Sequence, residues 1–297
     1  MNNFSRVVGL TDLVDPDENF EAAFSRLHAQ NPSSPIIHEI ESRVVNYFRN
    51  MTLPASPTLY DYLLLALRPK DLIATFNWDP FLYQAFCRNH TVGELPSLSF
   101  LHGSVAVGYS STARKAGPVG MFADRECLHE FEPTRLLYPV AKKDYNSDEF
   151  IAREWAKLSG WLEHARRVTV FGYSAPVTDV EAVKLMRKAW GDPLHRDLEQ
   201  FEIINDQPED VVTPRWRQFV HAHHYDYCRE YFESSLSAFP RRTGERFMHR
   251  FLPSTPEEAF QESNPVPQHF DTLQKLWEWH RPLIEKETLS RSRDMNS

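Results

Sequence analysis

The 297-residue sequence predicts an α/β fold: a Rossmann-like parallel sheet with helical insertions and a helical C-terminal appendage. From residue 71 onward, short apolar runs alternate with segments of helical periodicity, which is the pattern of βαβ units. After Pro240 the pattern changes, because several prolines interrupt the chain before a single helical segment. We therefore expect a Rossmann-type domain over residues 1–240 and a C-terminal helical appendage over residues 241–297.

The spacing of apolar residues predicts the individual elements. Ahead of the sheet we expect a strand stub over 7–10 and helices over 19–29, 36–48 and 58–67. Strands are expected over 71–76, 98–101, 167–171, 201–204 and 219–223, with a further strand end over 136–140. Helices are expected over 79–88, 147–164, 179–190 and 226–238, and near 270–287 in the appendage. Residues 103–135 have no regular pattern beyond a small hairpin.

Composition excludes several classes of protein. Lys and Arg number 33 against 41 Asp and Glu, so the net charge of −8 argues against binding to nucleic acid or to an anionic membrane. No apolar run approaches the ~18 residues that cross a bilayer. The first residues lack a signal sequence, so we expect a cytoplasmic protein. The three cysteines are far apart, which excludes a disulfide framework and a four-cysteine zinc module.

Polar residues follow four of the expected strands. They are Asn77 and Asp79, His102 and Gly103, Gly172, Tyr173 and Ser174 with Asp179 further on, and Asn205. Taken singly, each group has an ordinary explanation as a helix cap or a tight turn. Because ligands of parallel sheets bind at the carboxyl ends of strands, we expect the four strand ends to lie on one edge of one sheet. Asn77, His102 and Gly172 would then line one cleft.

In their order along the chain, these segments resemble the sirtuin-like NAD-consuming family. The matching stretches are Thr75-Phe76-Asn77-Trp78-Asp79, Leu101-His102-Gly103-Ser104, Gly172-Tyr173-Ser174 through Asp179, and Ile203-Ile204-Asn205. The resemblance spans roughly residues 55 to 235. It implies NAD as a substrate and no metal.

The resemblance also implies a role for each residue. Asn77 would orient the water and the ribose, Asp79 would hold the loop against the nicotinamide side, and His102 would be a general base that titrates near neutrality. The nucleotide-binding residues would be Thr75, Gly103, Gly172, Tyr173, Ser174, Asp179 and Asn205. Among these, the 172–174 segment would approach phosphate, and Asn205 would meet the adenosine ribose. The nicotinamide leaving group is already cationic, so the reaction does not need strong acid catalysis.

The sequence departs from the family in two places. Deacetylating sirtuins carry a four-cysteine zinc module between the His-Gly and Gly-x-Ser segments, whereas this interval holds only Cys127. That difference favours the sirtuin-like NAD hydrolases, many of which act in bacterial anti-phage defence. The family also begins with Gly-Ala-Gly-x-Ser, which cradles the pyrophosphate, and in residues 1–20 Gly9 stands alone. Either the chain starts downstream of the true beginning, or this branch has lost the element.

Three functions therefore remain open. The leading hypothesis is hydrolysis of NAD to nicotinamide and ADP-ribose, and the rival is a catalytically inactive module that binds a nucleotide or a protein. A lysine deacylase or an ADP-ribosyltransferase comes third. The expected partner is NAD or an ADP-ribose-type nucleotide, with a homo-oligomer or a defence-system partner as further alternatives. His221, His223, His224 and Cys228 are better explained as a polar edge strand than as a metal site.

Overall fold

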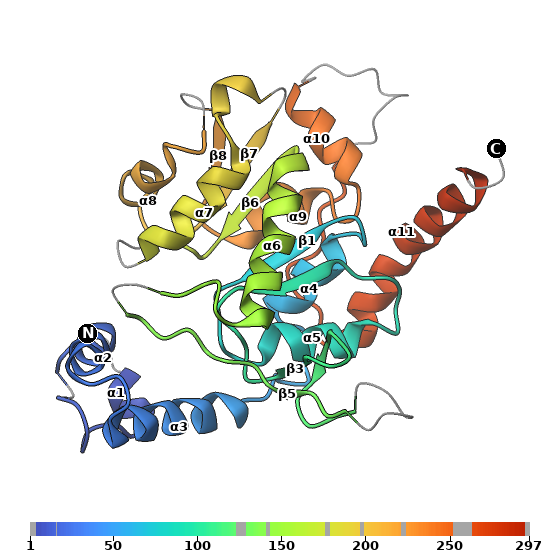
Figure 1. Ribbon diagram of the computed structural model, residues 1–297. Coiled ribbons are helices and arrows are strands. Elements are labelled where there is room, and N and C mark those ends of the chain that lie inside the picture. The colour runs from blue at the N-terminus through green and yellow to red at the C-terminus, as the bar shows by residue number, and fades with distance from the viewer. Residues whose placement is uncertain are drawn as a thin grey trace.

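The computed structural model describes residues 4–15, 17–122, 129–140, 143–175, 179–196, 199–220, 224–251 and 263–294. The helices are α1 Phe4–Val7, α2 Phe20–Gln30, α3 Pro35–Arg49, α4 Leu59–Ala66, α5 Phe81–Asn89, α6 Glu149–His164, α7 Val180–Trp190, α8 Glu209–Trp216, α9 Ser235–Ala238, α10 Thr243–Phe251 and α11 Leu273–Asp294. The strands are β1 Leu72–Thr75, β2 Ser97–Phe100, β3 Val107–Ser110, β4 Lys115–Pro118, β5 Glu132–Pro133, β6 Arg167–Phe171, β7 Gln200–Ile204 and β8 Tyr225–Cys228. The chain thus has the predicted α/β fold with parallel sheets and a helical C-terminal segment (Figure 1).

Two parallel sheets form the centre of the molecule. β1 pairs with β2, and β6, β7 and β8 form a second sheet in that order. Four of the expected strands are confirmed, as β1, β2, β6 and β7. The expectation that their ends belong to one sheet is wrong, because β1 and β6 each pair on one side only within the described part of the chain. A small antiparallel sheet, β4-β3-β5, occupies the region where we expected a hairpin.

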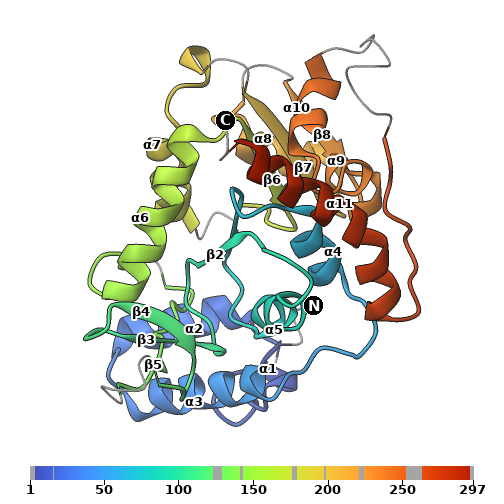
Figure 2. The same ribbon diagram turned by 90° about the vertical axis from the view of Figure 1, so that its right-hand side faces the viewer.

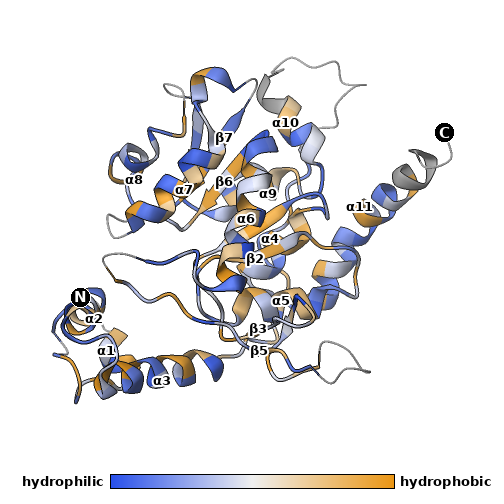
Figure 3. Cartoon of the chain, in the orientation of Figure 1, coloured by the Kyte–Doolittle hydropathy of each residue, from blue (hydrophilic) through white to orange (hydrophobic). Residues whose placement is uncertain are grey.

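Helices cover both faces of the central strands. α6 packs beside α7 and contacts β1 and β2, and α4 contacts α5 and α9. In Figure 2, α6 and α7 lie on one side of the strands, and α4, α9 and α11 lie on the other. Figure 3 shows apolar residues concentrated on the central strands and on the inward stripe of helices such as α3. This three-layer arrangement is why the strands are rich in apolar residues on both faces.

The amino-terminal helices form a lobe with its own apolar core. Phe20, Phe24 and Ile40 are buried there, and the lobe meets the rest of the molecule through residues that include Trp78 and Tyr138. The strand stub that we expected over 7–10 is wrong, since α1 runs from Phe4 to Val7. Three apolar side chains in a run of four residues carry no reliable periodicity, and residues 8–9 follow α1 as a turn.

The region after β7 differs most from the expectation. The helix expected over 226–238 is wrong, because Tyr225–Cys228 forms β8 against β7 and α9 is only four residues long. The strand expected over 219–223 falls partly outside the described residues, and 219–220 is not a strand. Residues 136–140 contain no strand either. α8 and α10 were not expected, and α8 is hard to recognise because Pro214 lies inside it.

The C-terminal helix packs against the α/β core. Trp277 Nε1 donates to Asn89 Oδ1 at 2.7 Å, and Glu287 accepts from Arg68 and Arg241 at 2.7 and 2.8 Å. The expected helix near 270–287 is confirmed as α11, although the division into a domain and an appendage stays a prediction. In the part of the chain that the structure describes, no helix has the length and apolar character needed to cross a bilayer.

Candidate functional site

The carboxyl ends of four strands meet at one rim, which we call the carboxyl rim and define by residues 75–79, 101–104, 172–174 and 205. Main-chain bonds join the ends in pairs, since Leu101 N donates to Thr75 O and Gly172 N donates to Ile204 O, both at 2.9 Å. Side chains join one pair to the other, because the rings of Phe76 and Tyr173 stack with centroids 4.3 Å apart. The predicted gathering of strand ends therefore occurs at the junction of two sheets.

His102 lies inside this rim. Its side chain is buried, the ring of Phe76 meets its edge with centroids 4.8 Å apart, and Nε2 lies 3.3 Å from the hydroxyl oxygen of Tyr145. The pKa of His102 is lowered to about 3, first by burial and then by the nearby Lys143 ammonium, while the Asp179 carboxylate opposes the decrease. The imidazole is thus neutral at physiological pH, rather than titrating near neutrality as the sequence suggested, because burial disfavours its charged form.

A buried ion pair lies next to His102. Lys143 Nζ is 2.5 Å from Asp179 Oδ1, and Tyr173 donates its hydroxyl hydrogen to Asp179 Oδ2 at 3.0 Å. Both charged side chains are less than a tenth exposed. Asp179 therefore links the Gly-Tyr-Ser loop to the segment that carries Lys143 and Tyr145. Burial, with the Asp179 charge next in effect, raises the pKa of the Tyr173 and Tyr145 hydroxyls, so both stay protonated.

Asn77 and Asp79 begin the connection from β1 to α5. Asn77 is exposed, and its backbone N–H donates to the Thr75 hydroxyl at 3.1 Å. Asp79 accepts from the Phe81 backbone N–H at 3.0 Å, and burial raises the pKa of its carboxyl group. The Asp79 carboxylate thus forms a turn just ahead of α5, whose N-cap is Pro80, so it helps to begin the helix without being its N-cap. The same contact also holds the loop that presents Asn77.

The glycines differ in what their conformation requires. Gly103 has a φ of +79°, and a Cβ there would lie 2.1 Å from the Arg135 carbonyl oxygen, so close packing alone demands glycine. Gly172 has a φ of +68°, and a Cβ there would meet nothing within 4 Å. At Gly172 the positive φ favours glycine, while the space beside its Cα is open.

Asn205 and Ser174 lie on the β6–β7 side of the rim. The side-chain oxygen of Asn205 accepts from the Gln207 backbone N–H at 3.0 Å, which forms a turn at the end of β7. Arg215 donates to the carbonyl oxygen of Ser174 at 3.1 Å. These contacts give both residues a structural role, and the shared pairing of β6 with β7 keeps them next to Gly172.

Sequence reasoning missed three side chains of this site. Lys143 and Tyr145 come from a stretch without regular structure, so no spacing of apolar residues indicates which of its side chains face the interior. Tyr60 extends from α4 and forms a side-chain hydrogen bond with Asn77, and burial raises its pKa. Only the mixture of charged and aromatic residues over 142–145 hinted at a buried polar contact. His221 and His223, weighed as metal ligands, lie outside the described residues.

Within the described ranges, no three His, Cys, Asp or Glu side chains are grouped to hold a metal ion. Among the described residues of the rim, the neutral His102 lies beside the buried Lys143–Asp179 ion pair. The neutral His102 can accept a proton, and Lys143 is the cation closest to it that the structure links to the rim.

Comparisons with known proteins give limited guidance. No family model matches the sequence, and no curated protein matches it. Solved structures that resemble the chain include a Sir2 homologue in complex with NAD, 15% identical with a TM-score of 0.37, with 74% of each chain covered. A mutant Sir2 homologue bound to ADP-ribose is 15% identical with a TM-score of 0.39 and coverage of 83% and 85%. Sir2 bound to an acetylated peptide is 15% identical with a TM-score of 0.36 and coverage of 70% and 82%.

Proposed function

We propose that the carboxyl rim binds NAD and hydrolyses its nicotinamide–ribose bond. The observation that carries this proposal is the buried, neutral His102 placed between two aromatic rings and beside the Lys143–Asp179 pair. Motifs of the family that the sequence resembles supply the other residues, Asn77 and Gly172. The proposal thus rests on residue types and their placement together.

The chemistry needs a base and a dry site rather than a strong acid. The bond from the ribose C1′ to the nicotinamide nitrogen breaks with its electron pair moving to the nitrogen, and a water oxygen bonds to C1′ through an oxocarbenium-like state. The water proton passes to His102, and Asn77 orients the water. The products are nicotinamide, ADP-ribose and one proton, which His102 later returns to solvent.

The low pKa of His102 sets a condition on this mechanism. An imidazole with a pKa of about 3 is a weak base, and part of the decrease comes from the Lys143 charge. A diphosphate that approaches Lys143 would offset that charge and raise the pKa of His102, since opposite charges favour the protonated ring. Binding of the nucleotide would thereby activate the base that acts on it.

The low pKa also favours a second candidate function, a nucleotide-binding or protein-interaction module without catalysis. If no ligand restores the basicity of His102, the rim binds a nucleotide and leaves it intact. Binding without turnover would identify this module.

The experiment measures nicotinamide released from NAD by the purified full chain. His102→Ala and Asn77→Ala should each lower the rate by about 10²–10⁴-fold, because each removes a group that acts on the attacking water. His280→Ala is the matched control, since His280 is also a buried histidine but lies in α11. NAD binding by calorimetry without release would support the inactive module, and release that survives His102→Ala would show that His102 is not the base.

Anti-phage defence, which the resemblance implies, is a separate part of the proposal. Bacteria that carry the chain should lose cellular NAD after phage infection, and bacteria that carry His102→Ala should retain it. Equal NAD levels in the two strains would contradict the defence role, and the hydrolysis of NAD by the purified chain would still be tested separately.

A further inference from the structure

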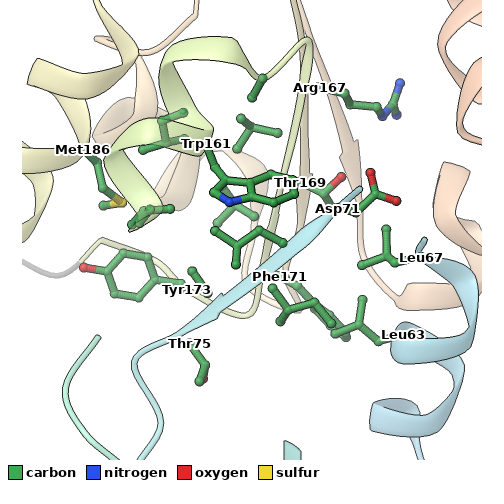
Figure 4. Close-up of a pocket in the computed structure, with 18 of the residues that line it drawn as sticks. Leu63, Leu67, Asp71, Thr75, Trp161, Arg167, Thr169, Phe171, Tyr173 and Met186 are labelled. Carbon is green, nitrogen blue, oxygen red and sulfur yellow. The ribbon is translucent and has the colours of Figure 1, made fainter. Parts of the chain in front are cut away.

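Three buried hydrogen-bond donors near the amino ends of the central strands have no partner. They are Nε of Arg167, the hydroxyl group of Thr243 and Nε of Arg246, and none of them forms a hydrogen bond with another described residue. Arg167 begins β6, and the other two residues belong to the first turns of α10. All three residues line a cavity between β1 and β6, and Figure 4 shows Asp71 and Arg167 at this end of it. Because a buried donor without an acceptor is unfavourable, these groups indicate a place for an acceptor that the described residues do not supply.

Arg246 carries the charge that matters most here. The residue is only 8% exposed, and its guanidinium group forms no hydrogen bond or ion pair with another described residue. Its pKa is lowered to about 10, first by burial and then by the Arg167 charge, while Glu202 and Asp71 oppose the decrease. Buried charges in proteins are normally paired, because removing them from water is costly. Arg246 therefore presents to the cavity a positive charge that no described carboxylate contacts.

The two carboxylates that act on Arg246 are bonded to other groups. Glu202 accepts from Arg167 Nη2 at 3.1 Å and from the Ser235 backbone N–H at 2.9 Å. Asp71 accepts from the Arg68 backbone N–H at 2.8 Å. Glu202 thus neutralises Arg167, and the charge of Arg246 is left over.

The first turns of α10 are held against the sheet beside Arg167. Gln200 in β7 donates from Nε2 to the Phe247 carbonyl oxygen at 2.7 Å, and its Oε1 accepts from Arg167. One amide group therefore positions both the helix and the arginine. Thr243 and Arg246 are three residues apart, so they lie on one face of the helix. The amino end of a helix favours an anion, because its free N–H groups and its dipole are directed there.

The approach to this end of the cavity is also positively charged. Lys70 and Arg166 are exposed, line the cavity and directly precede Asp71 and Arg167. Among the described residues that line the cavity, Asp71 is the one acidic side chain. Exposed cations at the amino ends of β1 and β6 would thus attract an anion from solvent toward the buried Arg246.

From these observations we infer that Arg167, Thr243 and Arg246 form a binding site for a phosphate group, which we call the amino-end site. A single guanidinium group can satisfy both oxygens of a carboxylate, whereas a phosphate group offers further acceptor oxygens to donors from a second element. The amino-end site lies at the opposite ends of the strands from the carboxyl rim, so it is separate from the proposed nucleotide site. Free phosphate and a small phosphate monoester share this chemistry.

The experiment titrates the full chain with inorganic phosphate at constant ionic strength and follows the Nε–H signals of arginine side chains by NMR. The signals of Arg167 and Arg246 should shift in a saturable way, whereas the backbone amide of Gly172 at the rim should not shift. Parallel titrations use glycerol 3-phosphate and acetate. Tighter binding of glycerol 3-phosphate would identify a monoester as the ligand, and tighter binding of phosphate would identify the free ion. Acetate should bind at least about tenfold more weakly than either, since it leaves donors unpaired.

Two variants test the donors. Arg246→Met should weaken phosphate binding by about 10–100-fold, because it removes charged hydrogen bonds. In phosphate-free buffer the same variant should unfold at a higher urea concentration, since it replaces an unpaired buried charge with an apolar side chain. An arginine with a merely structural role would give the opposite change. Thr243→Val, which keeps the shape of the side chain, should weaken binding by about 2–10-fold.

Arg281→Met is the control, because Arg281 is an exposed arginine on α11, and it should change neither phosphate binding nor the urea midpoint. The inference is overturned if millimolar phosphate causes no saturable shift, or if acetate binds as tightly as phosphate. It is also overturned if Arg246→Met binds phosphate like the unsubstituted chain or unfolds at a lower urea concentration. None of these measurements needs NAD, so their outcome is independent of the proposed hydrolase activity.

Discussion

The carboxyl rim is built on β1 and β6, and so is the cavity of about 1210 Å³ that lies between residues 71–76 and residues 166–172 and that we call the slot (Figure 4). The two strands are joined at the rim but not along the slot. At the rim, side chains connect β1 to β6 through the Phe76–Tyr173 stack, and Tyr173 continues to Asp179. Along the slot, the same strands present main-chain groups that no described strand pairs. Side-chain contacts thus join the β1 half of the candidate site to the β6 half. A polar site can therefore form at the carboxyl ends of two strands that do not pair with each other.

The largest effect should come from breaking the charged link at the rim. Asp179→Ala leaves Lys143 buried without its carboxylate, which should lower the free energy of unfolding by about 3–5 kcal/mol. Glu181→Ala is the control, because its pair with Lys184 is exposed and should contribute no more than about 0.5 kcal/mol. Urea unfolding measures both, and equal effects would mean that the buried pair does not stabilise the rim.

A matched pair of isoleucines tests the difference between slot and core. Ile203 in β7 is 1% exposed, and Ile203→Ala should lower the free energy of unfolding by about 2–5 kcal/mol. Ile73 in β1 lines the slot and is only half-buried, so Ile73→Ala should cost about 1 kcal/mol. A loss at Ile73 as large as that at Ile203 would show that the slot is closed in solution.

Acid should destabilise the protein through its buried histidines. The pKa values of His102 and His280 are lowered to about 3 and about 4, mainly by burial, from an ordinary value of 6.5. At a pH between these lowered values and 6.5, the two histidines bind protons in the unfolded chain but not in the native protein. Stability therefore falls as the pH drops below about 6.5, by at most about 1.4 kcal/mol per pH unit for each histidine.

The test of this prediction is unfolding at pH 7, 6 and 5. His102→Gln should reduce the slope of the free energy of unfolding against pH by the contribution of one proton. His280→Gln, in α11, should reduce the slope by the same amount. If neither variant changes the slope, other groups govern the acid sensitivity.

The sequence predicted the strands that carry the site but not how they assemble. Apolar runs marked β1, β2, β6 and β7 because each is covered by helices, and the Phe76–Tyr173 stack joins the ends of β1 and β6. The roles of the polar residues after these strands stay a prediction. Pairing between strands depends on contacts distant in sequence, so the division into two sheets could not be foreseen. β8 was taken for a helix because Tyr225-Asp226-Tyr227-Cys228 is too short and mixed to show a period.

Within the site, the residues that follow strands were recognisable, and those from irregular segments were not. Lys143 and Tyr145 reach His102 from a stretch whose position is set by tertiary packing alone. The lowered pKa of His102 could not be predicted from the sequence either, since it depends on how deeply the ring is buried and on which charges lie beside it.

The most direct test of the central claim, that a nucleotide binds at the rim, is a titration of the full chain with ADP-ribose followed by backbone amide chemical shifts. The chemical shifts of the Asn77, His102 and Gly172 amides should change in a saturable way and give the same dissociation constant. Those of Leu72 and Arg167, at the amino ends of the same strands, should stay unchanged. Absence of any shift at millimolar ADP-ribose, or shifts confined to Leu72 and Arg167, would contradict the account.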